Sequence, residues 1–190
     1  MILSDRDIRR YLQNKTLIIK PQPDLEKQLG AASLDIRLGE SFRVFNTTQK
    51  FVVDPLDPET FKDLTSLVRI DQKHPFVLHP HQFVLAITYE WLSLPDNLGA
   101  RIEDRSSWGR LGVIVHSTAG YVDPGFQGNL TLEMSNISPI PILLYPQVKI
   151  CQLAFETLSS PAEVPYSAKK TAKYAGATEP QPSQIFKDFQ

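Results

Sequence analysis

Residues 129–135 read Asn-Leu-Thr-Leu-Glu-Met-Ser, in which apolar and polar side chains alternate strictly. Because successive side chains of a β-strand point to opposite faces of the sheet, the two leucines and the methionine are expected on one face. Thr131 and Glu133 are expected on the other face. The stretch therefore predicts a strand with one face in the core and one polar face.

Short runs rich in β-branched and aromatic residues continue on both sides of this stretch. They lie at residues 17–19, 33–38, 42–45, 51–53, 76–78, 83–87, 113–115, 142–145 and 149–155. Turn residues separate the runs, and the chain has 15 prolines against nine glycines. Many short strands between stiff turns in one chain of 190 residues predict a mainly β domain, either a sandwich, a jelly roll or a barrel.

Two helices are expected outside the strands. Ser4 is a suitable N-cap, Asp7 follows at the third helical position, and apolar residues recur on one helical face from Ile8 onward. A second, short helix is expected within residues 58–68. The sequence therefore predicts a β domain with a helix at its N-terminus.

The composition excludes several classes of protein. The chain has 20 basic and 21 acidic side chains, and its net charge of −1 gives no reason to expect binding to nucleic acid or to a membrane. The only cysteine, Cys151, excludes an internal disulfide and any zinc site built from a cysteine pair, and it favours a reducing, cytoplasmic compartment. Residues 1–10 are not expected to form a signal peptide, and no apolar run approaches the roughly 18 residues of a membrane span. His79 and His81 have no carboxylate at ligand spacing, which favours loop histidines over a metal site.

The composition changes after residue 158. Residues 1–158 form the expected β domain, and residues 159–190 are small, polar and proline-containing. Two interpretations remain open for this segment, which is either a disordered tail or an arm that becomes ordered over a ligand. Its lysines Lys169, Lys170 and Lys173 suit an anionic ligand.

Residues 105–110, Arg-Ser-Ser-Trp-Gly-Arg, place two guanidinium groups and two hydroxyl groups within six residues. Phosphate oxygens are bound by such guanidinium groups and by hydroxyl or backbone donors. The same residues also suit a polar turn that caps a helix, with Ser106 or Ser107 at the N-cap. On the residues alone, both interpretations remain open.

Two further features carry candidate chemistry. Glu133 lies in the middle of the alternating strand, where a glutamate either faces solvent or lines a pocket as a proton-transfer group. Residues 120–128 predict a hairpin with Asp123 and Phe126 near its tip. The Asp-Pro-Gly sequence is ordinary turn chemistry, although the aromatic ring could also pack on a sugar whose hydroxyl donates to the carboxylate.

Together these segments resemble the dCTP deaminases of the dUTPase-like superfamily. The resemblance runs through ILSDRDIRRYL (2–12), SLDIRLG (33–39) and SLPDNLGARIE (93–103). It is densest in RSSWGRLG (105–112), HSTAGYVDPGFQGNLTLEMSN (116–136) and LYPQVKICQL (144–153). It ends with PYSAKKTAKY (165–174) and PSQIF (182–186), and so it covers nearly the whole chain.

This resemblance implies a dUTPase-like fold, a distorted jelly roll or β-barrel with an N-terminal helix and a C-terminal arm. It implies a homotrimer with active sites between subunits, each closed by the arm. The implied reaction is the hydrolytic deamination of dCTP to dUTP and ammonia without zinc, in the pathway that leads to dUMP and dTMP. Mg²⁺ would arrive with the triphosphate, and dTTP is implied as a feedback inhibitor.

The resemblance also assigns roles to residues. Glu133 matches the family's general acid and base, and Arg110 matches an arginine that supports the reacting centre electrostatically. Ser106 and the segment that ends at Ala119 match groups that position the attacking water. The implied nucleotide-binding positions are Arg105, Ser106, Ser107, Trp108, Gly109, Arg110, Asp123, Phe126, Thr131, Leu132, Glu133, Gln152, Tyr166 and Lys173.

The chain departs from the family pattern at two positions. Ala177 stands where relatives often carry a glutamine that contacts the nucleotide, and this affects the expected closure of the arm or the affinity for triphosphate. Trp108 stands where a leucine is usual, and this affects the expected packing.

Three alternatives to a deaminase that releases dUTP remain. Some family members also hydrolyse the dUTP to dUMP and diphosphate. Gly120 and Gln152 resemble that bifunctional subgroup, in which Asp123 would also orient the water that attacks the α-phosphate. A dUTPase without deaminase activity and a non-catalytic, nucleotide-sensing trimer are the other two alternatives.

Overall fold

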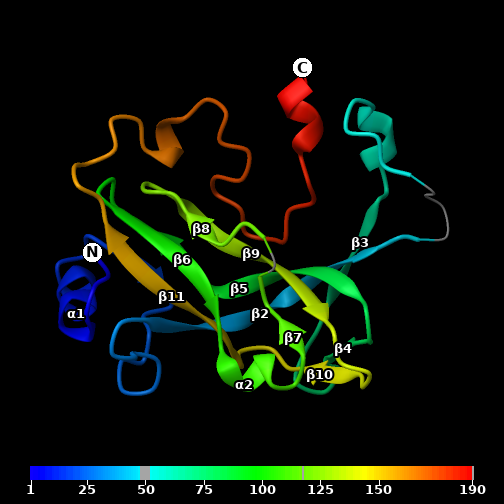
Figure 1. Ribbon diagram of the computed structural model, residues 1–190, viewed down its shortest axis with the longest axis horizontal. Helices are drawn as coiled ribbons and strands as arrows, with labels where there is room; N and C mark the ends of the chain where they lie inside the picture. The colour runs from blue at the N-terminus through cyan, green and yellow to red at the C-terminus, as the bar shows by residue number, and fades with distance from the viewer. Residues whose placement is uncertain (48–51, 117, 190) are drawn as a thin grey trace.

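The computed structural model describes residues 1–47, 52–116 and 118–189. Within them, nine antiparallel strands form one curled sheet that makes up the body of the molecule (Figure 1). The strands are β1 (Ile18–Lys20), β2 (Leu34–Phe45), β3 (Thr65–Arg69), β5 (Phe83–Ser93), β6 (Leu98–Asp104), β7 (Val113–Ile114), β8 (Tyr121–Val122), β9 (Gln127–Asn136) and β11 (Lys149–Thr157). Their order is β7-β9-β5-β2-β11-β6-β8, with β1 paired to β5 and β3 to β2. A separate small sheet pairs β4 (Phe76–Leu78) with β10 (Ile142–Leu144).

The long strands β2, β5, β9 and β11 contribute buried side chains to a common core. In β9 the burial alternates residue by residue, so that Leu132 and Met134 are fully buried while Thr131 and Glu133 are half-buried on the opposite face. The alternation predicted for this strand is therefore confirmed, and so is the mainly β fold class.

The N-terminal helix is confirmed as α1 (Asp5–Gln13), which buries Ile8 against the sheet. Ser4 is the N-cap residue, but its hydroxyl donates to the Asp7 carboxylate at 3.2 Å instead of accepting a backbone N–H. The second expected helix is shorter than predicted. Only η1 (Pro58–Phe61) is helical, because the chain then enters β3 and pairs with β2. Across the described ranges, no helix is long and apolar enough to cross a membrane.

The hairpin predicted over residues 120–128 does not form. β8 pairs with β6, whereas β9 pairs with β5 and β7. A turn closed by the bond from Phe126 N–H to the Asp123 carbonyl, at 3.1 Å, joins the two strands. Because Asp-Pro-Gly carries the chain between two parts of the sheet, Asp123 and Phe126 lie at the junction of these parts.

The C-terminal segment, residues 159–189, is an arm that folds back over the sheet of its own chain, shown in orange and red in Figure 1. It contains η2 (Tyr166–Ala168) and η3 (Ile185–Phe189). The Asn129 N–H donates to the Ala177 carbonyl at 2.8 Å, and Arg43 Nε donates to the Pro180 carbonyl at 2.7 Å. Near the end of the arm, the ring of Phe186 lies 5.2 Å from that of Phe61 in η1.

Candidate active site

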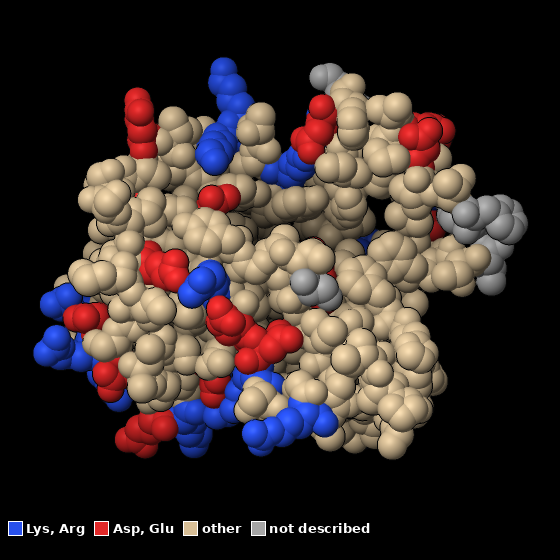
Figure 2. Space-filling view, in the orientation of Figure 1, with Lys and Arg blue, Asp and Glu red and all other residues tan. Residues whose placement is uncertain are grey.

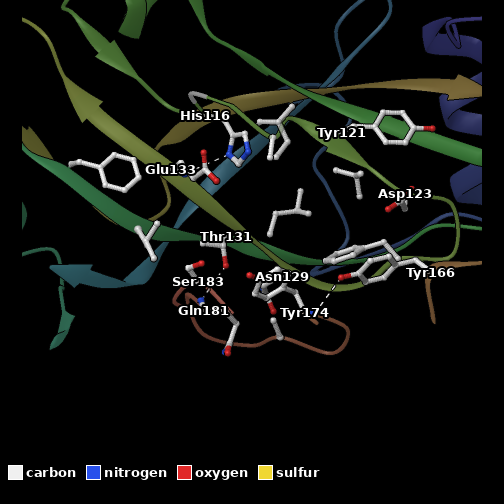
Figure 3. Close-up of a pocket in the computed structure, with 18 of the residues that line it drawn as sticks. His116, Tyr121, Asp123, Asn129, Thr131, Glu133, Tyr166, Tyr174, Gln181 and Ser183 are labelled. Atoms are coloured by element: carbon white, nitrogen blue, oxygen red, sulfur yellow. Dashed lines mark hydrogen bonds between the residues drawn. The ribbon is translucent and has the colours of Figure 1, made fainter. Parts of the chain in front are cut away.

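A cavity of about 440 Å³ lies between the polar face of β9, the segment that leads into β8, and the arm (Figure 3). Figure 2 shows the surface hollowed beneath the arm, with acidic and basic side chains interspersed over this face. The lining residues are Phe45, Phe83, Leu85, Ile102, His116, Ala119, Tyr121, Val122, Asp123, Phe126, Asn129, Leu130, Thr131, Glu133, Tyr166, Tyr174, Ala177, Gln181 and Ser183. Most of these side chains are apolar, and the few polar groups are concentrated on β9 and on the arm.

Glu133 presents its carboxylate to this cavity because the alternation of β9 turns it away from the core. The Thr118 hydroxyl donates to Glu133 Oε2 at 2.6 Å. A hydrogen bond from a hydroxyl holds a carboxylate in place without neutralising its charge. The group can therefore accept a proton from a bound water and release it again.

His116 also lines the cavity, beside Glu133 (Figure 3). The Glu133 backbone N–H donates to His116 Nδ1 at 3.4 Å. His116 Nε2 is buried and has no hydrogen-bond partner in the part of the chain that the structure describes. Sequence reasoning did not select this histidine, because no local motif marks it and its contact with β9 is visible only in the folded chain.

At the other end of the cavity, Asp123 lies near the Tyr166 ring (Figure 3). The Phe126 and Tyr166 ring centroids are 5.8 Å apart, and the Tyr166 N–H donates to the Pro124 carbonyl at 2.8 Å. The Asp-Pro-Gly turn thus brings an acidic group and an aromatic ring to the same end of the cavity, and the arm adds a second ring.

The arm forms one wall of the cavity through its backbone as well as its side chains. The Gln181 N–H donates to the Thr131 hydroxyl at 3.2 Å, and the Tyr174 N–H donates to the Tyr166 hydroxyl at 3.2 Å. Gly128 has a φ of +143°, and a Cβ at this position would lie 3.1 Å from the backbone N and O of Ala177. The close approach of the arm to β9 therefore requires glycine at residue 128.

The model of the dCTP deaminase-like family matches residues 2–158. The chain belongs to this family. The "dCTP deaminase, dUMP-forming" of Methanosphaera stadtmanae is 47% identical over 99% of this chain and 95% of that protein. The protein of the same name from Dictyoglomus thermophilum is 49% identical over 100% of this chain and 97% of that protein. The family predicted from the sequence motifs is confirmed, and with it the prediction that the chain is an enzyme.

One solved structure shows the same fold. The 2'-deoxycytidine 5'-triphosphate deaminase from Agrobacterium tumefaciens aligns with a TM-score of 0.64 at 24% sequence identity. The alignment covers 83% of this chain and 48% of that chain, so this chain spans about half the length of that protein. The predicted dUTPase-like fold class is therefore confirmed.

In this member of the dCTP deaminase-like family, the expected site residues fall into two groups. The cavity brings together Ala119, Asp123, Phe126, Thr131, Glu133 and Tyr166. Leu132 lies on the same strand with its side chain buried in the core. None of residues 105–110 lines the cavity. They form α2 (Ser106–Gly109) and its flanks, which lie beyond the far ends of β6 and β11 in Figure 1.

Gln152 and Lys173 also lie outside the cavity lining. Gln152 lies on β11, next to residues 105–110, which are called the α2 loop below. Its Oε1 accepts from the Ser33 hydroxyl at 2.7 Å. Lys173 Nζ lies 2.5 Å from Asp188 Oδ1, so its ammonium is paired with the end of the arm. In the described residues, no group of three or more histidine, cysteine, aspartate and glutamate side chains is placed to hold a metal ion.

Proposed function

We propose that this protein deaminates dCTP hydrolytically and then releases dUMP and diphosphate. The observation that supports the deamination best is the carboxylate of Glu133, presented by β9 to a cavity of nucleoside size. The sequence alone favoured dUTP as the end product. The dUMP-forming names of relatives 47% and 49% identical over almost the whole chain favour the second step as well.

In the proposed deamination, Glu133 takes a proton from a water as the water oxygen bonds to C4 of the cytosine. The carboxyl passes this proton to the pyrimidine N3. It then takes the second proton from the new C4 hydroxyl and gives it to the 4-amino group, so that the C4–N bond breaks, ammonia leaves and the uracil carbonyl forms. Thr118 holds the carboxylate through its hydroxyl, and the backbone ending at Ala119 borders the water position. Asp123 accepts a hydrogen bond from the 3′-hydroxyl, and Phe126 packs on the deoxyribose. The backbone of Thr131 and Leu132 forms hydrogen bonds with the edge of the base.

The remaining groups come from a second copy of the chain. Ser106 and Arg110 lie outside the cavity that contains Glu133, so one chain does not complete the proposed site. A homotrimer would bring the α2 loop of one subunit to the cavity of the next. Large apolar side chains exposed around the small sheet support such assembly, because exposed apolar clusters mark contact surfaces. They are Val77, Ile137, Ile140 and Leu143.

In the second step, Asp123 would orient the water that attacks the α-phosphorus, and diphosphate would leave. Mg²⁺ would be held mainly by the phosphates and by water, as this ion prefers, and it would neutralise part of their charge. Tyr166 and Lys173 of the arm and Gln152 would contact the triphosphate. We further propose a cytoplasmic site of action and feedback inhibition by dTTP.

The test is product analysis after incubation with dCTP and Mg²⁺, with dUTP as a parallel substrate. The proposal predicts ammonia, dUMP and diphosphate from dCTP, and hydrolysis of added dUTP. Accumulation of dUTP without its hydrolysis would support the proposed deamination and contradict the proposed second step. Absence of turnover of either nucleotide would overturn the proposed function, and kinetics unchanged at millimolar dTTP would remove the feedback inhibition.

A further inference from the structure

A polar network connects the start of the α2 loop to β2 and β11. Arg105 Nε lies 3.0 Å from Asp35 Oδ1, and Arg105 Nη1 donates to the Lys149 carbonyl at 3.1 Å. The Trp108 indole N–H donates to the same carbonyl at 2.8 Å. The other carboxylate oxygen of Asp35 lies 3.1 Å from Lys149 Nζ, which also donates to the Lys27 carbonyl at 2.7 Å. The loop is thus fixed at two of its three large side chains, Arg105 and Trp108.

An irregularity in the sheet makes the Lys149 carbonyl accessible to side chains. Lys149 pairs with Arg37 and Cys151 pairs with Ile36, so the register of β11 on β2 shifts between these two pairs. The backbone N–H of Arg37, opposite Lys149, donates to the Glu90 carboxylate instead of across the ladder. A β-bulge commonly redirects backbone groups in this way. Here the Lys149 carbonyl accepts hydrogen bonds from two side chains of the α2 loop, Arg105 and Trp108.

The network restricts the orientation of the Arg105 guanidinium. Two of its nitrogens, Nε and Nη1, are engaged by Asp35 and Lys149, while Nη2 has no partner in the described part of the chain. The Asp35 side chain is only 16% exposed, and that of Arg105 is 28% exposed. A carboxylate shielded in this way holds a guanidinium more firmly than a surface pair does.

We propose that Asp35, assisted by Trp108, is a positioning residue that orients Arg105 so that its remaining donors face the triphosphate of the nucleotide. This inference rests on the proposed function and on the phosphate-binding interpretation of residues 105–110, which form the α2 loop. It assigns Asp35 a role in nucleotide affinity although it touches neither base, sugar nor phosphate. Trp108, placed where the family usually has leucine, then contributes a hydrogen bond that leucine lacks.

The main test is Asp35→Asn, measured as kcat and KM for dCTP in the purified assembly. Because phosphate contacts act in the bound ground state and the transition state alike, we expect KM to rise about five- to twentyfold with kcat within about twofold. Glu156→Gln is the matched control, since Glu156 also forms an ion pair on β11, with Arg101 at 2.8 Å, but away from α2. Glu156→Gln should change neither kcat nor KM.

A KM for dCTP that falls in Asp35→Asn would overturn the proposal. If Asp35 only neutralises Arg105 and Lys149, its loss raises the positive charge of the loop, and KM falls. An unchanged KM, or a kcat that falls with KM constant, also contradicts the positioning role. Equilibrium binding of inorganic triphosphate provides a second readout, which separates failure of this inference from failure of the proposed reaction. Binding to the unaltered protein but not to Asp35→Asn supports the inference even without turnover of dCTP, and equal binding to both proteins overturns it.

Trp108→Phe keeps an aromatic side chain but replaces the indole by a smaller phenyl ring without an N–H donor, so it remains informative if Asp35→Asn does not fold. We expect KM to rise about two- to fivefold, the effect of one neutral hydrogen bond. Trp91→Phe is the matched control, because Trp91 contacts Lys20 on β1 and no residue of the α2 loop. In Trp91→Phe, Trp108 is the only tryptophan. Its fluorescence should then change when inorganic triphosphate binds, and an unchanged spectrum at saturation would contradict the proposal.

Discussion

Glu90 and Glu133 lie on the neighbouring strands β5 and β9 and have opposite surroundings. Glu90 is fully buried. Its Oε1 accepts from Arg37 Nε at 2.6 Å and from Gln28 Nε2 at 3.2 Å, and its Oε2 accepts the Arg37 backbone N–H at 2.8 Å. A buried carboxylate with an arginine partner and several donors stabilises one arrangement of the sheet.

Glu133 differs from Glu90 in what it faces. It lines the cavity, and the Thr118 hydroxyl donates to its carboxylate. We propose that the same residue type on adjacent strands supports the fold at Glu90 and the reaction at Glu133, because the Glu90 carboxylate is fully buried whereas that of Glu133 lines the cavity. The comparison leads to four predictions.

Glu133→Gln should have the largest effect on activity. Glutamine keeps the shape of the side chain but cannot take a proton from water, so we expect ammonia release to fall by about 10²- to 10⁴-fold. Binding of dCTP and the oligomeric state should be retained. Ammonia release close to that of the unaltered protein would exclude Glu133 as the general acid and base.

Glu90→Gln should instead lower stability. It removes the charge that pairs with Arg37, and breaking a buried ion pair from one side costs about 3–5 kcal/mol. Urea unfolding followed by circular dichroism measures this loss. The kcat of the fraction that remains folded should change much less than in Glu133→Gln. A variant of unaltered stability would show that Glu90 does not hold the sheet together.

Thr118→Val is expected to lower kcat about tenfold. The variant removes the hydroxyl that donates to Glu133 Oε2, and a hydrogen bond to a charged group contributes about 1.5–3 kcal/mol. Thr118→Ser restores a hydroxyl and should recover most of the activity. If valine and serine give the same kcat, this hydrogen bond does not support the reaction.

The fourth prediction concerns Cys151 and the stability of the fold, and its expected effect is the smallest of the four. Burial raises the pKa of this thiol above its usual range, and the charges of Glu90 and Asp104 add to the shift. Below the ordinary thiol pKa both states keep the proton. Above it only the unfolded state loses the proton, so stability falls as pH rises, by at most about 1.4 kcal/mol per pH unit.

Cys151→Ala has no thiol at this position and therefore lacks this pH-dependent fall in stability. The difference in unfolding free energy between the unaltered protein and Cys151→Ala, measured in urea, should therefore be constant from pH 7 to pH 8 and shrink by pH 10. A difference that is the same at all three pH values would show that the thiol titrates equally in both states.

The alternating sequence of β9 was sufficient to predict which side chains enter the core, because period-two alternation is a local property of the strand. The motifs around Glu133 indicated the family for the same reason, since they are continuous in sequence. The pairing of β8 with β6 was not predictable. A strand of two residues carries almost no pattern of its own, and its partner is selected by the tertiary structure.

Two features of the candidate site also depend on long-range contacts. His116 meets β9 across 17 residues, through a backbone N–H that any residue at position 133 except proline could supply. The order of the arm arises from its contacts with η1, β2 and β9 of its own chain, whereas its composition alone left disorder equally open. Sequence patterns describe local periodicity, and these contacts join distant segments.

The docking of the arm on its own chain has a genetic consequence. In the proposed trimer, one subunit supplies the cavity and the arm of a site, and its neighbour supplies the α2 loop. An allele altered at Glu133 and an allele altered at Arg110 should therefore complement each other in one cell, because mixed trimers contain sites that are intact in both parts. Two alleles altered at Glu133 and in the arm should complement far less, since every site with an intact carboxylate then has a defective arm.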